Sequence, residues 1–184
     1  MVHLLLLTAA RGAGKTTACQ RFVELARAAD LRVGGILTPA RYDSEGVKIG
    51  FDAVDVFTGE GRLLAEISRE KTRRTVGWYH FHSQTMQWAL ERVLQALAAP
   101  LDSVIVDEIG PLELEKGAGF APVLDALEAT RATSVILVVR RALLEALRER
   151  LANFSPLVVS FSVQTREHAP ERLFAQVWQW VVEN

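Results

Sequence analysis

A glycine-rich segment near the amino terminus carries the clearest chemical signature in the sequence. Residues 9–17 read AARGAGKTT, and they stand between an apolar run, Val2 to Thr8, and a segment with helical spacing, Thr16 to Ala29. A strand, this loop and then a helix form the context in which the pattern binds phosphate. Glycines let successive backbone N–H groups face one anion, and the helix adds its positive dipole end. We therefore predict a phosphate-binding loop whose contacting residues are Gly12, Ala13, Gly14, Lys15, Thr16 and Thr17.

Three side chains of this loop have predicted roles in phosphate chemistry. The Lys15 ammonium is expected to reach the β- and γ-phosphates, and the Thr16 hydroxyl to coordinate Mg²⁺. Thr17 adds a second hydroxyl near the α-phosphate. Ala9 stands where the usual pattern begins with glycine, and alanine is the smallest replacement.

A second apolar run ends in two acids. Ser103 to Val106 is a predicted strand, followed by Asp107 and Glu108. Carboxyl ends of parallel strands meet at one edge of a sheet, so Asp107 is expected at the edge where the phosphate loop opens and is a candidate Mg²⁺ ligand. Glu108 is a candidate base that orients a water beside the γ-phosphate and takes its proton.

Three further charged residues follow predicted strands or turns, and each has a structural alternative. Glu113 serves the site or caps the turn at Gly110-Pro111. Arg140 and Arg141 follow the strand predicted at Thr133 to Val139. They contact phosphate, flank the base, or are solvated at a helix start.

Short apolar runs alternate with longer helical patterns, which predicts an α/β fold. Alternating residues at 47–56 and the run at 62–67 flank a Gly-Glu-Gly turn, so an antiparallel hairpin should join a mostly parallel sheet. We expect a three-layer arrangement with the phosphate-loop strand directly beside the strand ending in Asp107. The polar stretch Glu66 to Thr75 is expected to be a mobile loop.

Composition limits the class of protein. The chain has 184 residues, enough for one domain with a core, so residues 1–184 are expected to form a single domain. The 21 basic and 22 acidic residues nearly cancel, which argues against nucleic acid or an anionic membrane as partner. No apolar run is long enough to span a bilayer. Cys19 is the only cysteine, which fits a reducing cytoplasm. No feature identifies a protein partner.

Four segments, in this order, resemble the cancer-related nucleoside-triphosphatase family, whose bacterial and archaeal members include thermophilic enzymes. The fourth is the most specific, because an acidic strand end does not by itself require the Ile-Gly-Pro-Leu-Glu that follows here. The matching segments are Gly12 to Thr17; Gly34 to Thr38 with Arg41 and Gly50-Phe51; Val76-Gly77 with Tyr79; and Asp107 to Leu114 with Phe120.

The resemblance implies a P-loop fold related to RecA-like ATPases and nucleotide kinases. It also implies slow, Mg²⁺-dependent hydrolysis of nucleoside triphosphates, with broad tolerance of the base. Arg41 is the family-matched arginine, a candidate to neutralise charge on the γ-phosphate, with a surface residue beside a turn as the alternative. Two other functions stay open: a kinase that phosphorylates a small acceptor, with residues 66–75 as its lid, and a regulatory switch loaded with nucleotide.

Overall fold

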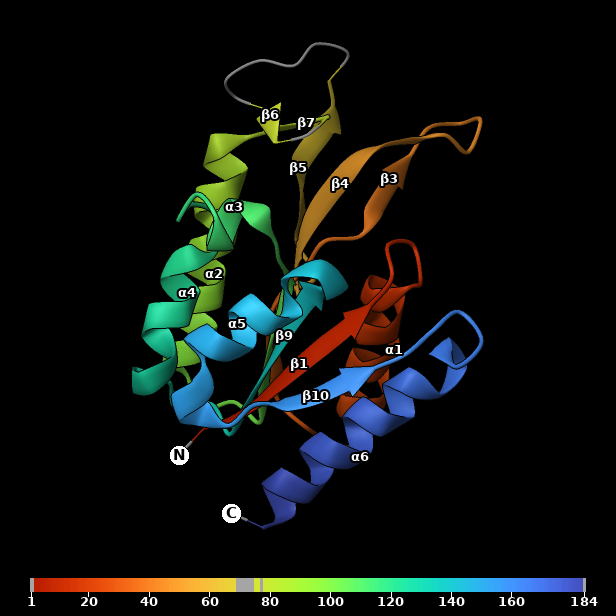
Figure 1. The fold of residues 1–184 in the computed structure, drawn as a ribbon. Coiled ribbons are helices and arrows are strands. Elements are labelled where there is room, and N and C mark those ends of the chain that lie inside the picture. Colours follow the sequence, from red (N-terminus) through yellow and green to blue (C-terminus); the bar gives the residue numbers. More distant parts are fainter. Residues whose placement is uncertain (1, 69–74, 77, 184) are drawn as a thin grey trace.

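The computed structural model describes residues 2–68, 75–76 and 78–183 (Figure 1). Ten strands of this part form one sheet, and helices lie on both of its faces. The strands are β1 (His3–Ala9), β2 (Val33–Leu37), β3 (Ala40–Tyr42), β4 (Lys48–Asp55), β5 (Gly61–Ile67), β6 (Thr75–Val76), β7 (Tyr79–Phe81), β8 (Ser103–Ile109), β9 (Ser134–Arg140) and β10 (Leu157–Ser160). The α-helices are α1 (Lys15–Ala28), α2 (Ser83–Ala98), α3 (Pro111–Leu114), α4 (Ala121–Ala126), α5 (Leu144–Arg150) and α6 (Ala169–Val182).

The sheet has a parallel half and an antiparallel half. Its order is β10-β1-β9-β8-β2-β4-β5-β7-β6, with β3 also paired to β4. The first five strands are parallel, and every pairing from β2–β4 onward is antiparallel. The predicted mixed sheet with its hairpin, β4–β5, is therefore confirmed. The antiparallel half is larger than one hairpin, since it also includes β3, β6 and β7.

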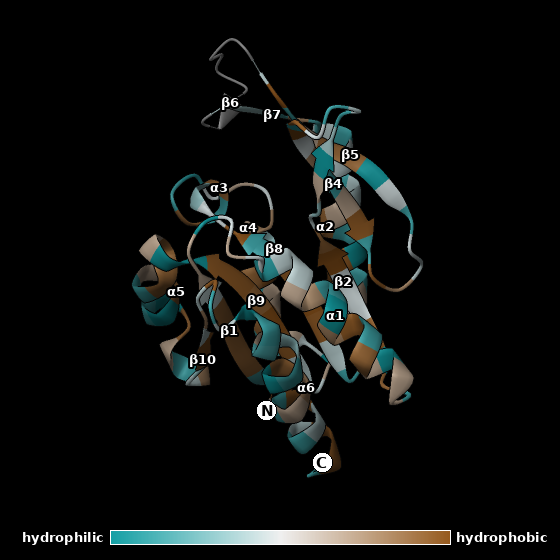
Figure 2. Cartoon of the chain, turned by 90° about the vertical axis from the view of Figure 1, so that its right-hand side faces the viewer, coloured by the Kyte–Doolittle hydropathy of each residue, from teal (hydrophilic) through white to brown (hydrophobic). Residues whose placement is uncertain are grey.

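Two apolar clusters fill the space between the sheet and the helices, which confirms the three-layer arrangement. Leu5 and Leu7 of β1 face α1 and α6, and Leu4 and Leu6 face α2, α4 and α5. β1 is therefore buried on both faces, as its continuous apolar sequence requires. Figure 2 shows brown on β1 and β9 at the centre and more teal on the surrounding helices. The parallel strands are thus held rigidly, and their carboxyl ends form a fixed edge.

The prediction that β1 and β8 are adjacent strands is wrong, because β9 lies between them. All six residues from Ser134 to Val139 are buried. A strand with this sequence needs cover on both faces and a partner on both edges, so it takes a central place. The phosphate loop and the acidic pair still share one edge, since all three strands are parallel.

The acidic strand is also longer than predicted. β8 continues through Asp107 and Glu108 to Ile109, which is fully buried. Burial of Ile109 explains why the strand does not stop at the acids. The pairing with β9 shifts at this point: Asp107 pairs with Val138 and Ile109 with Val139, so Glu108 is an extra, bulged residue.

The loop predicted at Glu66 to Thr75 falls partly in a strand. Glu66 and Ile67 belong to β5, Thr75 belongs to β6, and residues 69–74 lie outside the described residues. The short strands β3, β6 and β7 and the short helix α3 were not predicted, because elements of two to four residues show too little periodicity.

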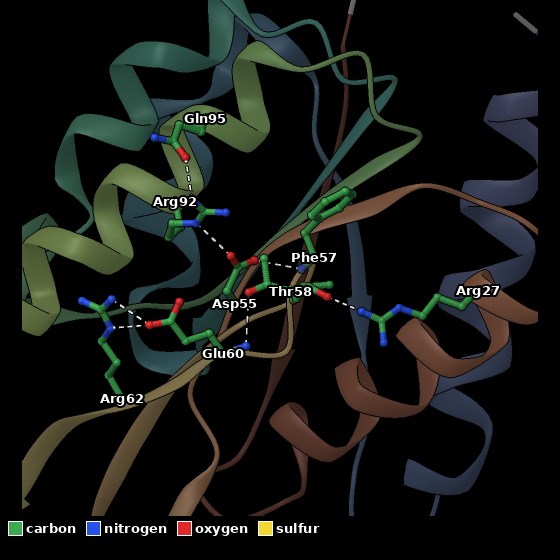
Figure 3. Close-up of polar contacts among 9 residues, drawn as sticks. Arg27, Asp55, Phe57, Thr58, Glu60, Arg62, Arg92 and Gln95 are labelled. Atoms are coloured by element: carbon green, nitrogen blue, oxygen red, sulfur yellow. Dashed lines mark hydrogen bonds and ion pairs between the residues drawn. The ribbon is translucent and has the colours of Figure 1, made fainter.

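Polar contacts fix the β4–β5 hairpin to helices on both faces of the sheet (Figure 3). Asp55, at the end of β4, is almost fully buried and pairs with Arg92 of α2 at 2.8 Å. Its other oxygen accepts the backbone N–H of Phe57 at 2.8 Å. From the opposite face, Arg27 of α1 donates to the carbonyl of Val56. These contacts join the antiparallel half to the layers around the parallel half.

Among the described residues, no helix combines the length and apolar character needed to cross a lipid bilayer.

Candidate active site

The loop after β1 has the backbone that its glycines allow. Gly12 and Gly14 adopt φ angles of 76° and 96°, in the region that side chains disfavour. A Cβ atom at either position would meet no other atom within 4 Å. Glycine is therefore needed here because of the backbone conformation, since protein atoms leave room for a side chain. The N–H of Ala13 closes the turn by donating to the carbonyl of Ala10 at 3.2 Å.

Helix α1 begins at Lys15 with the first-turn N–H groups turned toward the loop. Gly14 is its N-cap, and no side chain caps this end. The first turn holds no acidic residue, so the positive end of the helix is not neutralised locally. Uncapped N–H groups at a helix start are a ready site for a phosphate anion.

The Lys15 side chain folds back over the same loop. Its Nζ lies 3.4 Å from the carbonyl oxygen of Ala9 and 3.5 Å from that of Ala10. The residue is 9% exposed. The ammonium is thus held by weak, neutral acceptors, which a phosphate oxygen can replace with a stronger charge-assisted bond.

Asp107 lies beside this helix start. Its carboxylate accepts the backbone N–H of Thr38 at 3.1 Å and interacts with the Thr16 side chain, which lowers the pKa of Asp107. This interaction with Thr16 joins the segments that follow β1 and end β8, on either side of β9. The structure therefore brings the predicted Mg²⁺ pair together, although their strands are not neighbours. Thr38 was missed from sequence because the contact uses its backbone.

Burial raises the pKa of Asp107 to about 6, from an ordinary 3.8. The nearby Glu108 carboxylate also raises it. Hydrogen bonds from Thr16 and Thr38 and the charge of Lys15 act in the opposite direction. Asp107 is only 1% exposed. A carboxylate this buried is costly to ionise without a close cation, which is a reason to expect that a cation binds it.

Glu108 lies at the same edge and points to a different partner. Its Oε1 accepts a hydrogen bond from Nε of Arg140 at 2.6 Å. The Glu108 side chain is 25% exposed, so water can reach it. Arg140 is the last residue of β9 and pairs with Ala9, the first residue of the loop. Contact with phosphate was one of three roles predicted for Arg140, and the ion pair with Glu108 was not among them.

Glu113 has the structural role that the sequence left as an alternative. Its Oε2 accepts the N–H of Gly110 at 2.8 Å, and its Oε1 accepts that of Phe120 at 3.1 Å. Burial raises the pKa of Glu113, and these two N–H donors oppose the shift. A Cβ atom on Gly119 would stand 2.3 Å from this carboxylate. Glu113 therefore fixes the turn that follows the acidic pair.

Two candidate arginines make no described contact with this group of residues. Arg41 lies on β3 and pairs with Asp52 of β4, Nε to Oδ1 at 3.0 Å. Its phosphate contact stays a prediction. Arg141 is exposed in a 3₁₀ turn directly after β9.

Comparisons with known proteins agree with this geometry. A family model described as NTPase matches residues 4–174. The chain is 33% identical to "Nucleoside-triphosphatase THEP1" of Methanopyrus kandleri over 185 residues, which is 100% of this chain and 99% of that protein. It is 27% identical to the protein of the same name from Thermofilum pendens, over 94% and 93% of the two chains.

Two solved structures have a similar fold. The solution structure of a human cancer-related nucleoside triphosphatase superposes with a TM-score of 0.74 at 24% identity, covering 96% of this chain and 97% of the other. The crystal structure of THEP1 from Aquifex aeolicus gives a TM-score of 0.70 at 18% identity, covering 95% and 98%. Both agree with the α/β arrangement of this chain.

Proposed function

The chain belongs to the NTPase family, and on this premise we propose that it is a nucleoside-triphosphatase. It hydrolyses the γ-phosphate anhydride of nucleoside triphosphates to a nucleoside diphosphate and phosphate. The observation that carries this proposal is that the phosphate loop and the acidic pair lie at one edge of the sheet, where Thr16 interacts with Asp107 and Arg140 bonds Glu108.

The loop and the first turn of α1 bind the phosphate chain. Backbone N–H groups of residues 12–17 supply the anion site, and Gly12 and Gly14 permit its shape. Lys15 moves from the carbonyls of Ala9 and Ala10 to the β- and γ-phosphate oxygens. Thr17 adds its hydroxyl near the α-phosphate. Positive charge at the γ-phosphate stabilises the charge that develops there during transfer.

Thr16 and Asp107 fit a magnesium ion. A hydroxyl and a carboxylate are hard oxygen ligands, and the two are already in contact. The buried Asp107 lacks a compensating cation, apart from the nearby Lys15, in the described structure. Bound there, Mg²⁺ would neutralise negative charge on the phosphates.

Glu108 acts on the attacking water. The water oxygen forms a bond to the γ-phosphorus as the bond from that phosphorus to the bridging oxygen breaks, and the Glu108 carboxylate takes a proton from the water. The two carboxylates have different partners, because Asp107 accepts the N–H of Thr38 and Glu108 accepts Nε of Arg140. We assign Asp107 to the cation and Glu108 to the water. Arg41 is kept as a second candidate cation for the γ-phosphate.

The whole chain is proposed to work as one cytoplasmic domain. All strands of the described part belong to one sheet, and the lone cysteine, Cys19, is buried. The nucleotide is the partner that the site supports.

The test is a phosphate-release assay with Mg²⁺ and each of ATP, GTP, CTP and UTP. Free phosphate is compared with phosphorylated acceptor when nucleosides are added, which separates hydrolysis from kinase activity. Lys15→Ala should abolish turnover and leave the fold intact. Wild-type kcat/KM in that variant would contradict the assigned site.

Two glutamates five residues apart, Glu108 in β8 and Glu113 in α3, provide a matched pair of variants. Glu108→Gln should lower kcat by roughly 100-fold or more, the scale for losing a positioned base, without weakening nucleotide binding. Glu113→Gln should alter stability and leave kcat within a few-fold of wild type, because Glu113 binds backbone N–H groups. If instead Glu108→Gln retains activity and Glu113→Gln loses it, the assignment of the base is wrong.

A further inference from the structure

Arg140 stands between the two halves of the site. β9 separates β1 from β8, and Arg140 is its last residue. On one side it pairs in register with Ala9, where the phosphate loop begins. On the other side its Nε donates to Glu108. The one residue therefore touches the candidate base and adjoins the phosphate loop.

The distance to the phosphate site is short. Neighbouring strands are about 4.8 Å apart, and the Lys15 ammonium is 3.4 Å from the carbonyl oxygen of Ala9. A guanidinium on Arg140 is thus within a side chain's length of the place where Lys15 meets phosphate. About half of the Arg140 side chain is exposed, so packing does not lock it in place.

The contact between Arg140 and Glu108 fits the protein before nucleotide binding better than the protein during hydrolysis. The Glu108 oxygen that accepts a charge-assisted bond from the guanidinium is engaged there and is not free to bind the attacking water. The guanidinium is bonded through Nε alone, and Glu108 is its only partner among the described residues. A γ-phosphate has more oxygens and more negative charge than a carboxylate, so it is the stronger partner for the planar guanidinium.

We propose that Arg140 recognises the γ-phosphate by exchanging partners. Before a nucleotide binds, it holds Glu108; when a nucleoside triphosphate binds the loop, its guanidinium passes to the γ-phosphate and releases the Glu108 carboxylate to the attacking water. This inference rests on the proposed function and names the residue that distinguishes a triphosphate from a diphosphate. A diphosphate does not reach the guanidinium, so Glu108 returns to Arg140 once phosphate has left.

The exchange has two consequences that a purely structural ion pair would lack. Arg140 contributes to binding of a triphosphate and not of a diphosphate. Glu108 competes with the γ-phosphate for the guanidinium, so loss of the Glu108 charge should strengthen triphosphate binding. Both consequences appear in binding measurements that involve no turnover.

The experiment is titration calorimetry with Mg²⁺ and either ADP or the non-hydrolysable β,γ-imido analogue of ATP. Arg140→Ala should weaken binding of the analogue by about 10- to 100-fold, which is the scale of a lost hydrogen bond to a charged group. Its affinity for ADP should change by less than about threefold. Arg140→Lys keeps the positive charge but loses the planar guanidinium. Its affinity for the analogue should lie between those of wild type and Arg140→Ala. Arg150→Ala removes another exposed, ion-paired arginine, bonded to Asp125 at 3.0 Å, and should match wild type for both ligands.

A double-variant cycle tests the competition directly. Glu108→Gln should bind the analogue a few-fold more tightly than wild type, and this gain should vanish when Arg140→Ala is added. Equal weakening of ADP and the analogue in Arg140→Ala, or no weakening of either with a lower kcat, overturns the exchange. If Arg140→Ala does not fold, Arg140→Lys is used instead, and its ratio of analogue affinity to ADP affinity is compared with that of wild type. An unchanged ratio overturns the proposal.

Lys15→Ala separates this inference from the proposed function. That variant should lose affinity for both ligands, since Lys15 meets the phosphates in either. If Lys15→Ala binds as wild type does, the proposed site itself is wrong. If Lys15→Ala loses binding while Arg140→Ala keeps the wild-type ratio of affinities, the site stands and only the role of Arg140 is refuted.

Discussion

Replacing Asp107 by asparagine should make the ligand-free protein more stable while it destroys the proposed Mg²⁺ site. Burial raises the pKa of Asp107 from 3.8 to about 6. The two values differ by about two units, and each unit corresponds to about 1.4 kcal/mol, so ionised Asp107 costs the folded state roughly 3 kcal/mol at neutral pH. Asparagine keeps the size of the side chain and one acceptor for Thr16 or Thr38 but needs no ionisation.

The sign of the pH dependence follows from the direction of the shift. Below about pH 4 the carboxyl is protonated in both the folded and the unfolded chain, so it costs nothing. Between about pH 4 and 6 the folded chain keeps a proton that the unfolded chain has released, so this contribution to stability falls as pH rises. Above pH 6 the full penalty is present. The advantage of Asp107→Asn should therefore be small near pH 4.5 and largest near pH 8.

The assay is urea unfolding of wild type and Asp107→Asn at both pH values, without nucleotide or Mg²⁺. One acceptor oxygen is lost in the variant, which reduces the expected gain at pH 8 to about 1–3 kcal/mol, or several degrees in Tm. Addition of Mg²⁺ and the β,γ-imido analogue should stabilise wild type far more than the variant. A variant that is less stable than wild type at pH 8, or whose advantage is the same at both pH values, would refute the reasoning.

Three other substitutions test separate parts of the structure. Gly14→Ala forces a side chain to φ 96°, and we expect a loss of about 1–2 kcal/mol by thermal unfolding together with at least tenfold weaker nucleotide binding. Arg92→Ala leaves the buried Asp55 carboxylate without its ion-pair partner; because Arg92 is one-third exposed, the expected loss is about 1–3 kcal/mol, with kcat unchanged in the phosphate-release assay. Glu113→Gln can accept only one of the two N–H groups bound by Glu113, so denaturant unfolding should show a loss of about 1–3 kcal/mol, and an unchanged Tm would contradict its role as a cap.

The phosphate loop could be predicted from the sequence because its determinants are local. Gly12 and Gly14 must adopt positive φ angles, and a helix must begin at once after them. Both requirements restrict the residue types within one segment of nine residues, 9–17. The acidic pair was recognisable only together with the phosphate loop earlier in the chain, because solvated strand ends often carry two acids. The capping role of Glu113 was available as an alternative from the Gly110-Pro111 turn beside it.

Strand order was not predictable in the same way, because it depends on contacts between distant segments. The sequence of residues 134–140 does not determine that β9 pairs with β1 on one edge and with β8 on the other. Burial of all residues from Ser134 to Val139 excludes an exposed edge but does not name the neighbours. The bulge at Glu108 escaped for the same reason, since it becomes visible only through the register with β9.

The position of β9 changes what the two motifs can do. If β1 and β8 were neighbours, the phosphate loop and the acidic pair would meet directly, and no third strand would end between them. With β9 inserted, Thr16 and Asp107 interact across its end, and its last side chain, Arg140, adjoins both motifs. The strand that was not predicted between β1 and β8 is therefore the one that supplies the site with a cation able to couple phosphate binding to the base.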